Sequence, residues 1–169
     1  IPILRKNIEM QLDSGAEIVY VFDTNSKQLD REYFKKRYLR MVKKTLFQPF
    51  PKKIAYFSKN KSFYDLNKTE SNYSELAGTV FSLDKGFCSY LRGTKTGFVQ
   101  GNFSPTSLLK PHEEFLFDFN QFLEKMSSLS VPERAGWICS LNHGVLPKTP
   151  EINVRHFIET TREQLSIGS

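Results

Sequence analysis

Five short apolar segments of the chain are each followed at once by polar side chains that could bind a ligand. These pairs combine hydroxyl, ammonium, carboxylate, amide and imidazole groups: Asp23 with Thr24, Ser58 with Lys59, Asp84 with Lys85, Gln100 with Asn102, and Asn142 with His143. If the segments are parallel strands, these side chains gather at the carboxyl edge of one sheet, where ligands of α/β proteins bind. We therefore expect the functional site at this edge.

Several common kinds of site have no motif in the sequence. Gly101 and Gly144 are isolated, and neither G-x-G-x-x-G nor G-x-x-x-x-G-K occurs. The sequence therefore has no glycine-rich phosphate-binding motif that would indicate nucleotide binding. Cys88 and Cys139 are too few for a disulfide scaffold. Neither cysteine lies in a C-x-x-C or C-x-x-H arrangement, so we expect no metal.

The charge balance favours an anionic partner. The chain has 24 Lys and Arg residues against 18 Asp and Glu, a formal net charge of +6, with an isoelectric point near 9.3. Nucleic acid, an acidic membrane surface or a polycarboxylate would suit this charge, although mixed charges along a chain are most often a solvated surface. The longest apolar run, residues 18–22, has five residues, so we expect no membrane span. The cysteine usage makes the cytoplasm the default location.

Hydrophobic periodicity predicts strands that alternate with helices. We expect strands at residues 17–22, 53–57, 79–83, 97–100 and 137–141. Apolar residues at helical spacing predict helices over residues 4–12, 33–46, 115–126 and 154–165. Strands separated by helices pair in parallel through right-handed crossovers, so the predicted class is α/β.

The length of 169 residues fits one compact unit, and we expect residues 1–169 to form it without an internal boundary. Because the first residue is Ile1 and not Met, we also expect the chain to be part of something longer.

Two stretches resemble the end of the uroporphyrinogen decarboxylase family. Residues 99–109 (VQGNFSPTSLL) are similar to its QGNLDP turn, and residues 136–159 (GWICSLNHGVLPKTPEINVRHFIE) to its NLGHG, proline turn and ENV-type helix. Earlier, residues 21–25 (VFDTN), 56–59 (YFSK) and 82–84 (SLD) resemble the family's F-[DE]-S, FAK and GLDW strand ends. The order and spacing match along nearly the whole chain, which corresponds to about the second half of the family's length.

The resemblance implies a TIM-type (β/α)8 barrel, of which this chain supplies the carboxyl-terminal portion with about five parallel strands. Family members remove the four acetate carboxyls of uroporphyrinogen III as carbon dioxide, giving coproporphyrinogen III in haem biosynthesis, without metal or organic cofactor. They form homodimers and bind neither nucleic acid nor membrane. The family's catalytic aspartate, amino-terminal arginines and active-site tyrosine lie in the half that is absent, so no catalytic residue can be assigned here.

Two substrate-binding residues can be carried over from the resemblance. Thr24 takes the place of a serine whose hydroxyl helps to bind substrate carboxylates, and His143 corresponds to the histidine of G-H-G. Lys59, Asp84 and Asn102 are further candidates for contacts at the rim, although an aspartate at such a junction is as often a helix cap.

The sequence also departs from the family. Ser104 replaces the aspartate of N-L-D-P, Lys85 the tryptophan of L-D-W, and Asn142 the first glycine of G-H-G. These changes suit a fast-evolving lineage or a paralogue with an altered substrate.

Two other interpretations stay open. A corrinoid or thiol methyltransferase shares the barrel, but such enzymes hold zinc with an H-x-C motif, whereas Gly144 and Val145 follow His143. The other is a non-catalytic fragment that binds a tetrapyrrole or nothing.

Overall fold

Five parallel strands form one sheet in the order β1-β2-β3-β4-β5. The structure is a computed structural model that describes residues 2–67, 73–82, 85–93 and 97–165. The strands are β1 (Val19–Asp23), β2 (Ile54–Ser58), β3 (Gly78–Val80), β4 (Phe98–Phe103) and β5 (Trp137–Leu141). The predicted α/β class and parallel pairing are confirmed.

Two strands differ in length from the prediction by two residues, and β1 is one residue shorter than predicted. β3 ends at Val80, and residue 83 of the predicted strand lies outside the described residues. β4 continues to Phe103, because Gly101 and Asn102 stay in register with Cys139 and Ser140 of β5. Pairing with a neighbour thus overrides the low strand preference of glycine and asparagine.

Helices connect the strands. The long ones are α1 (Pro2–Asp13), α7 (His112–Ser127) and α9 (Glu151–Leu165), together with a continuous helix over residues 31–47. All four were predicted. Five short helical segments were not, because one or two turns show no clear period: η1 (Asn25–Gln28), α4 (Lys61–Asn67), α5 (Phe87–Arg92), α6 (Pro105–Leu108) and α8 (Val131–Arg134). None of the described helices is long and apolar enough to cross a membrane.

The helix over residues 31–47 buries most of the predicted stripe, including Phe34, Val42 and Leu46, together with two residues outside it. It consists of α2 (Arg31–Tyr33), the π turn η2 (Phe34–Tyr38), α3 (Leu39–Val42) and the π turn η3 (Lys43–Phe47). Each π turn inserts an extra residue, so the buried face moves along the chain to include Leu39 and Phe47. The apolar spacing had predicted a buried stripe of Tyr33, Phe34, Tyr38, Val42 and Leu46, but Tyr33 is 46% exposed.

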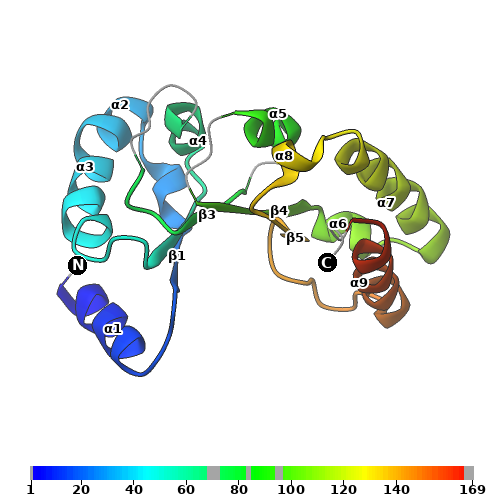
Figure 1. Cartoon of the computed structure of the whole chain (residues 1–169), viewed down its shortest axis with the longest axis horizontal. Coiled ribbons are helices and arrows are strands. Elements are labelled where there is room, and N and C mark those ends of the chain that lie inside the picture. Colours follow the sequence, from blue (N-terminus) through cyan, green and yellow to red (C-terminus); the bar gives the residue numbers. More distant parts are fainter. Residues whose placement is uncertain (1, 68–72, 83–84, 94–96, 166–169) are drawn as a thin grey trace.

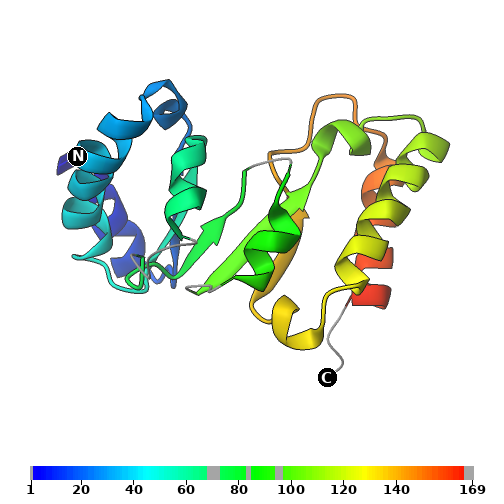
Figure 2. The ribbon, with the colours of Figure 1, turned by 90° about the horizontal axis from the view of Figure 1, so that it is seen from above.

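The helices from α2 onward lie in an arc along one side of the sheet (Figure 1). Phe103 of β4 packs against Phe115 and Phe119 of α7 and Phe157 of α9, and these two helices lie side by side (Figure 2). Asn153 of α9, fully buried, donates from Nδ2 to the carbonyl oxygens of Leu108 and Lys110 at 2.9 and 2.8 Å. The hydrophobic core therefore lies between the sheet and this helical arc.

The opposite face of the sheet is apolar and partly open. Tyr20, Phe22 and Ile138 are 39%, 63% and 42% exposed. Phe22 of β1 packs against Phe57 of the neighbouring strand β2. Tyr20 of β1 packs against Phe98 of β4, which is not its neighbour in the sheet. Because parallel sheets are normally covered on both faces, further chain is expected to pack here.

A carboxylate holds the carboxyl end of β1 in place. Asp23 accepts hydrogen bonds from the hydroxyls of Tyr38 and Tyr56 and from the backbone N–H of Ser26. Burial is the main reason why the pKa of Tyr56 lies far above its ordinary value, and the neighbouring Asp23 carboxylate raises this pKa further. Tyr56 is only 1% exposed, so its hydroxyl depends on this acceptor.

We predict that Asp23→Ala lowers the free energy of unfolding by about 1–3 kcal/mol, because it leaves a buried hydroxyl without its acceptor. Urea titration measures the change. Asp13→Ala, at an exposed position, is the matched control and should stay within about 0.5 kcal/mol of wild type. Adding Tyr56→Phe to Asp23→Ala should recover part of the lost stability, because the unpaired hydroxyl is then absent. Equal losses of stability in Asp23→Ala and Asp13→Ala would contradict this explanation.

Candidate functional site

A basic hollow lies at the carboxyl ends of the strands. It has a volume of about 680 Å³, and the loops after β1, β2, β3 and β5 supply its lining: Lys27, Lys59, Lys61, Ser82, Lys85, Asn142 and His143. We call this group of residues the basic hollow. Parallel pairing brings these loops together, as the sequence predicted for the edge of the sheet.

Buried polar contacts position the first two loops of the basic hollow. The hydroxyls of Ser26 and Ser58 are hydrogen-bonded at 2.9 Å. Asn60 donates from Nδ2 to the carbonyl oxygens of Ser26 and Leu29 at 2.9 and 3.1 Å. The backbone that carries Lys27, Lys59 and Lys61 is thereby tied across β1 and β2, whereas the side chains of Lys27 and Lys61 are exposed and that of Lys59 is partly buried.

A second set of contacts joins the ends of β2 and β3. The Tyr64 hydroxyl lies 2.8 Å from the Ser58 carbonyl oxygen and accepts from the Ser82 N–H at 3.2 Å. The Ser82 hydroxyl donates to the same Ser58 carbonyl at 2.7 Å. Burial raises the pKa of Tyr64 well above its ordinary value, so this hydroxyl stays protonated. Ser82 is consequently fixed at the wall of the hollow.

The electrostatics of the basic hollow favour anions. None of the described residues that line it is acidic. Its four lysines form no salt bridge with an acidic side chain in the described part of the chain, whereas Lys36, Lys43 and Lys110 elsewhere do. Ammonium groups, an imidazole, a hydroxyl and an amide can bind carboxylates through charge-assisted hydrogen bonds.

The structure brings only some of the predicted site residues together. His143 and Lys59 both line the basic hollow. Thr24 lies exposed at the end of β1, where it precedes η1 without making a capping side-chain bond, and it does not line the hollow. Asp84 lies outside the described residues. Asn102 lines a different cavity.

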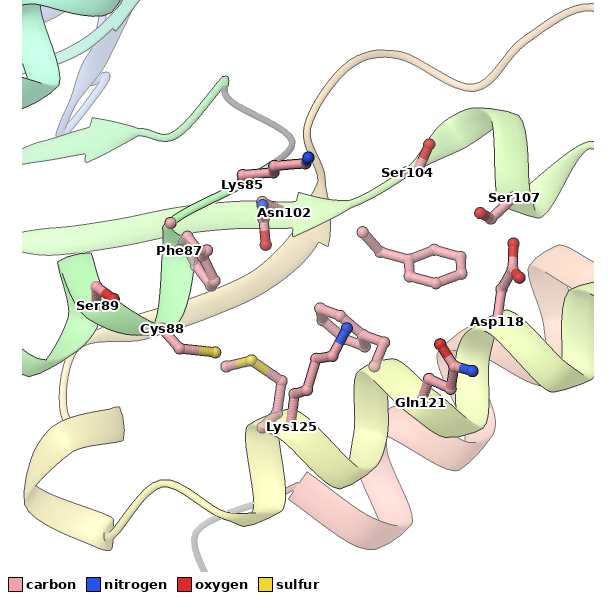
Figure 3. Close-up of a pocket in the computed structure, with 14 residues that line it drawn as sticks. Lys85, Phe87, Cys88, Ser89, Asn102, Ser104, Ser107, Asp118, Gln121 and Lys125 are labelled. Atoms are coloured by element: carbon pink, nitrogen blue, oxygen red, sulfur yellow. The ribbon is translucent and has the colours of Figure 1, made fainter.

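That second cavity lies between α5 and α7, beside the end of β4 (Figure 3). Its volume is about 480 Å³, and Lys125 and Gln121 of α7 line it across from Asn102 of β4. Its floor is apolar, with Phe87 and Met126. Lys85 borders both cavities, because it follows β3 at the junction between them.

Lys27, Lys61 and Ser82 are functional candidates that sequence reasoning did not single out as binding residues, whereas Lys85 was among the strand-end residues expected at the site. Lys27 and Lys61 each follow a predicted strand within a few residues. Both could have been predicted as site residues if the polar residues further along each loop had been considered. Their convergence depends on loop paths and on η1 and α4, which no periodicity revealed.

In the part of the chain that the structure describes, neither the Cys139 thiol nor a group of metal-ligand side chains suggests a metal site. Burial raises the pKa of Cys139 to about 11, so this thiol is protonated at neutral pH. Across the described ranges, no three His, Cys, Asp or Glu side chains are grouped as metal ligands would be. The zinc-dependent methyltransferase interpretation gains no support from this geometry.

Comparison with known proteins gives one consistent result. The family model described as "Uroporphyrinogen decarboxylase (URO-D)" matches residues 2–164. The chain is 30% identical over 158 residues to the uroporphyrinogen decarboxylase of Nostoc punctiforme, covering 90% of this chain and 42% of that protein. It is 28% identical over 169 residues to that of Gloeobacter violaceus, covering 98% and 47%.

The chain spans somewhat less than half the length of these curated relatives. A (β/α)8 barrel has eight strands, and five parallel strands are described here, so the sheet is part of such a barrel. With a match over residues 2–164, the chain belongs to the uroporphyrinogen decarboxylase family.

Proposed function

We propose that the full-length protein containing this chain decarboxylates uroporphyrinogen to coproporphyrinogen, and that residues 1–169 act as one unit that binds the substrate. The basic hollow supports this proposal most directly. It combines Lys59 and His143, which fall in the matching family motifs, with three further lysines at the edge where barrel enzymes bind their ligands. A polycarboxylate is the kind of ligand that this charge fits.

In this proposal the residues of the chain bind and orient the substrate. His143 and Lys59 donate hydrogen bonds to carboxylates that are not reacting, and the Thr24 hydroxyl adds a donor at the end of β1. Each reacting acetate loses carbon dioxide, and a protonated pyrrole takes up the electrons that remain. A carboxylate stabilises that cation, and it belongs to the half of the barrel outside this chain.

The expected oligomeric state, cofactors and partners follow from the family resemblance, and the expected location from the cysteine usage. We propose a cytoplasmic homodimer that needs neither metal nor organic cofactor and has no nucleic-acid or membrane partner. The alternative is a protein that binds tetrapyrroles without decarboxylating them. The departures at Lys85, Ser104 and Asn142 favour that alternative, because they alter three motif positions near the two cavities.

We predict that the full-length protein converts uroporphyrinogen to coproporphyrinogen, whereas residues 1–169 alone do not, because the proton donor and the cation-stabilising carboxylate are missing. Chromatography of the oxidised products under anaerobic assay conditions measures both. Decarboxylation by residues 1–169 alone would show that the catalytic groups lie in this half. Binding without turnover by the full-length protein would support the non-catalytic alternative.

We further predict that His143→Ala in the full-length protein lowers kcat/KM roughly 10- to 150-fold, which corresponds to one lost charge-assisted contact of about 1.5–3 kcal/mol. The loss should be partial, since the reacting groups lie elsewhere. His143→Gln keeps an N–H donor and should recover part of the activity. An unchanged kcat/KM in His143→Ala would remove His143 from the binding site.

A further inference from the structure

We propose that Lys27, Lys61 and Lys85 make the basic hollow discriminate among tetrapyrroles by the number of carboxylates they carry. The fully carboxylated substrate is held most tightly, and affinity falls with each carboxyl lost. This inference rests on the proposed function, which it extends from binding to the timing of release.

The three lysines come from three separate loops. Lys27 lies in η1 after β1, Lys61 is the first residue of α4 after β2, and Lys85 follows β3. They therefore surround the hollow from three strand ends, so a ligand with several carboxylates can contact them together. Together with Lys59 and His143, the three lysines make five basic side chains, more than the four carboxylates of the final product can pair with one to one.

None of these three lysines matches a residue of the family's motifs. Lys27 and Lys61 lie outside the motif residues that resemble the family, and Lys85 occupies the place of a tryptophan. Lys59 and His143, in contrast, fall within those motifs. The three lysines are thus separate from Lys59 and His143, the binding contacts that the family motifs support.

Each lysine contributes modestly, and the effect comes from their number. All three side chains are exposed, so water and salt screen each ion pair, and one pair changes affinity only roughly 2- to 5-fold. Within the described residues, no acidic side chain forms a salt bridge with any of the three. Three such pairs together give a steep dependence on ligand charge.

The reaction itself changes that charge. In each step an acetate side chain loses its carboxylate as carbon dioxide, and a proton joins the remaining carbon to form a methyl group. The ligand loses one negative charge per step, from eight carboxylates to four. The lysines therefore hold partly decarboxylated intermediates more tightly than the final product, which favours completion of all four steps before release.

The test compares two fluorescent probes on the full-length protein. Uroporphyrin I carries eight carboxylates and coproporphyrin I carries four, and fluorescence titration gives a Kd for each at low and high salt. In the triple variant Lys27→Ala, Lys61→Ala, Lys85→Ala, we expect the ratio of the coproporphyrin Kd to the uroporphyrin Kd to fall roughly 3- to 100-fold at low salt. During turnover, this variant should also release more intermediates with seven to five carboxylates.

The matched control removes the same charge outside the hollow: Lys6→Ala, Lys44→Ala, Lys53→Ala, all at exposed positions. It should leave the ratio close to wild type. The inference is overturned if the hollow variant keeps the wild-type ratio, or if the control variant lowers the ratio equally.

The two proposals fail in different ways. Normal decarboxylation with an unchanged ratio removes only the role of the lysines. A full-length protein that does not decarboxylate uroporphyrinogen removes the proposed function, and the probe titrations then still decide whether the lysines select by charge.

Discussion

Parallel strand pairing is the constraint on which the rest of this structure depends. Because all five strands run the same way, the loops that follow them meet at one edge, and side chains distant in sequence such as Lys27 and His143 line one hollow. The same pairing leaves an apolar face, with Tyr20 and Phe22 partly exposed, that an open five-stranded sheet cannot cover by itself. The edge thus carries the proposed chemistry, and the open face suits the rest of a barrel.

At this edge of the sheet, the polar contacts that hold the loops in place lie deeper than the lysines that we propose bind the ligand. The contacts among Asp23, Tyr56, Ser26, Ser58 and Asn60 are at least partly buried and fix the backbone of the first two loops. Buried polar groups are costly to leave unpaired, so this layer is rigid. The lysines above it are solvated and long, which suits a ligand whose charge changes during the reaction.

Much of the fold was predictable from local pattern, because β-branched and aromatic runs marked the strands and the spacing of Phe115, Phe119 and Met126 marked α7. The stripe predicted for residues 31–47 was right for Phe34, Val42 and Leu46 but missed Leu39 and Phe47, since π turns shift the buried face away from regular helical spacing. The site was predictable only in part. Strand-end reasoning placed Lys59 and His143 at the hollow, but the position of Asn102 depends on packing between α5 and α7, which no local pattern encodes.

The central claim is that carboxylates of a tetrapyrrole bind in the basic hollow. A crystal structure of the full-length protein with coproporphyrinogen or uroporphyrin bound tests it most directly. We predict carboxylate oxygens within hydrogen-bonding distance, roughly 2.7–3.2 Å, of Lys59 Nζ and an imidazole nitrogen of His143. A tetrapyrrole bound in the cavity between α5 and α7, or elsewhere with Lys59 and His143 left in solvent, would contradict the claim.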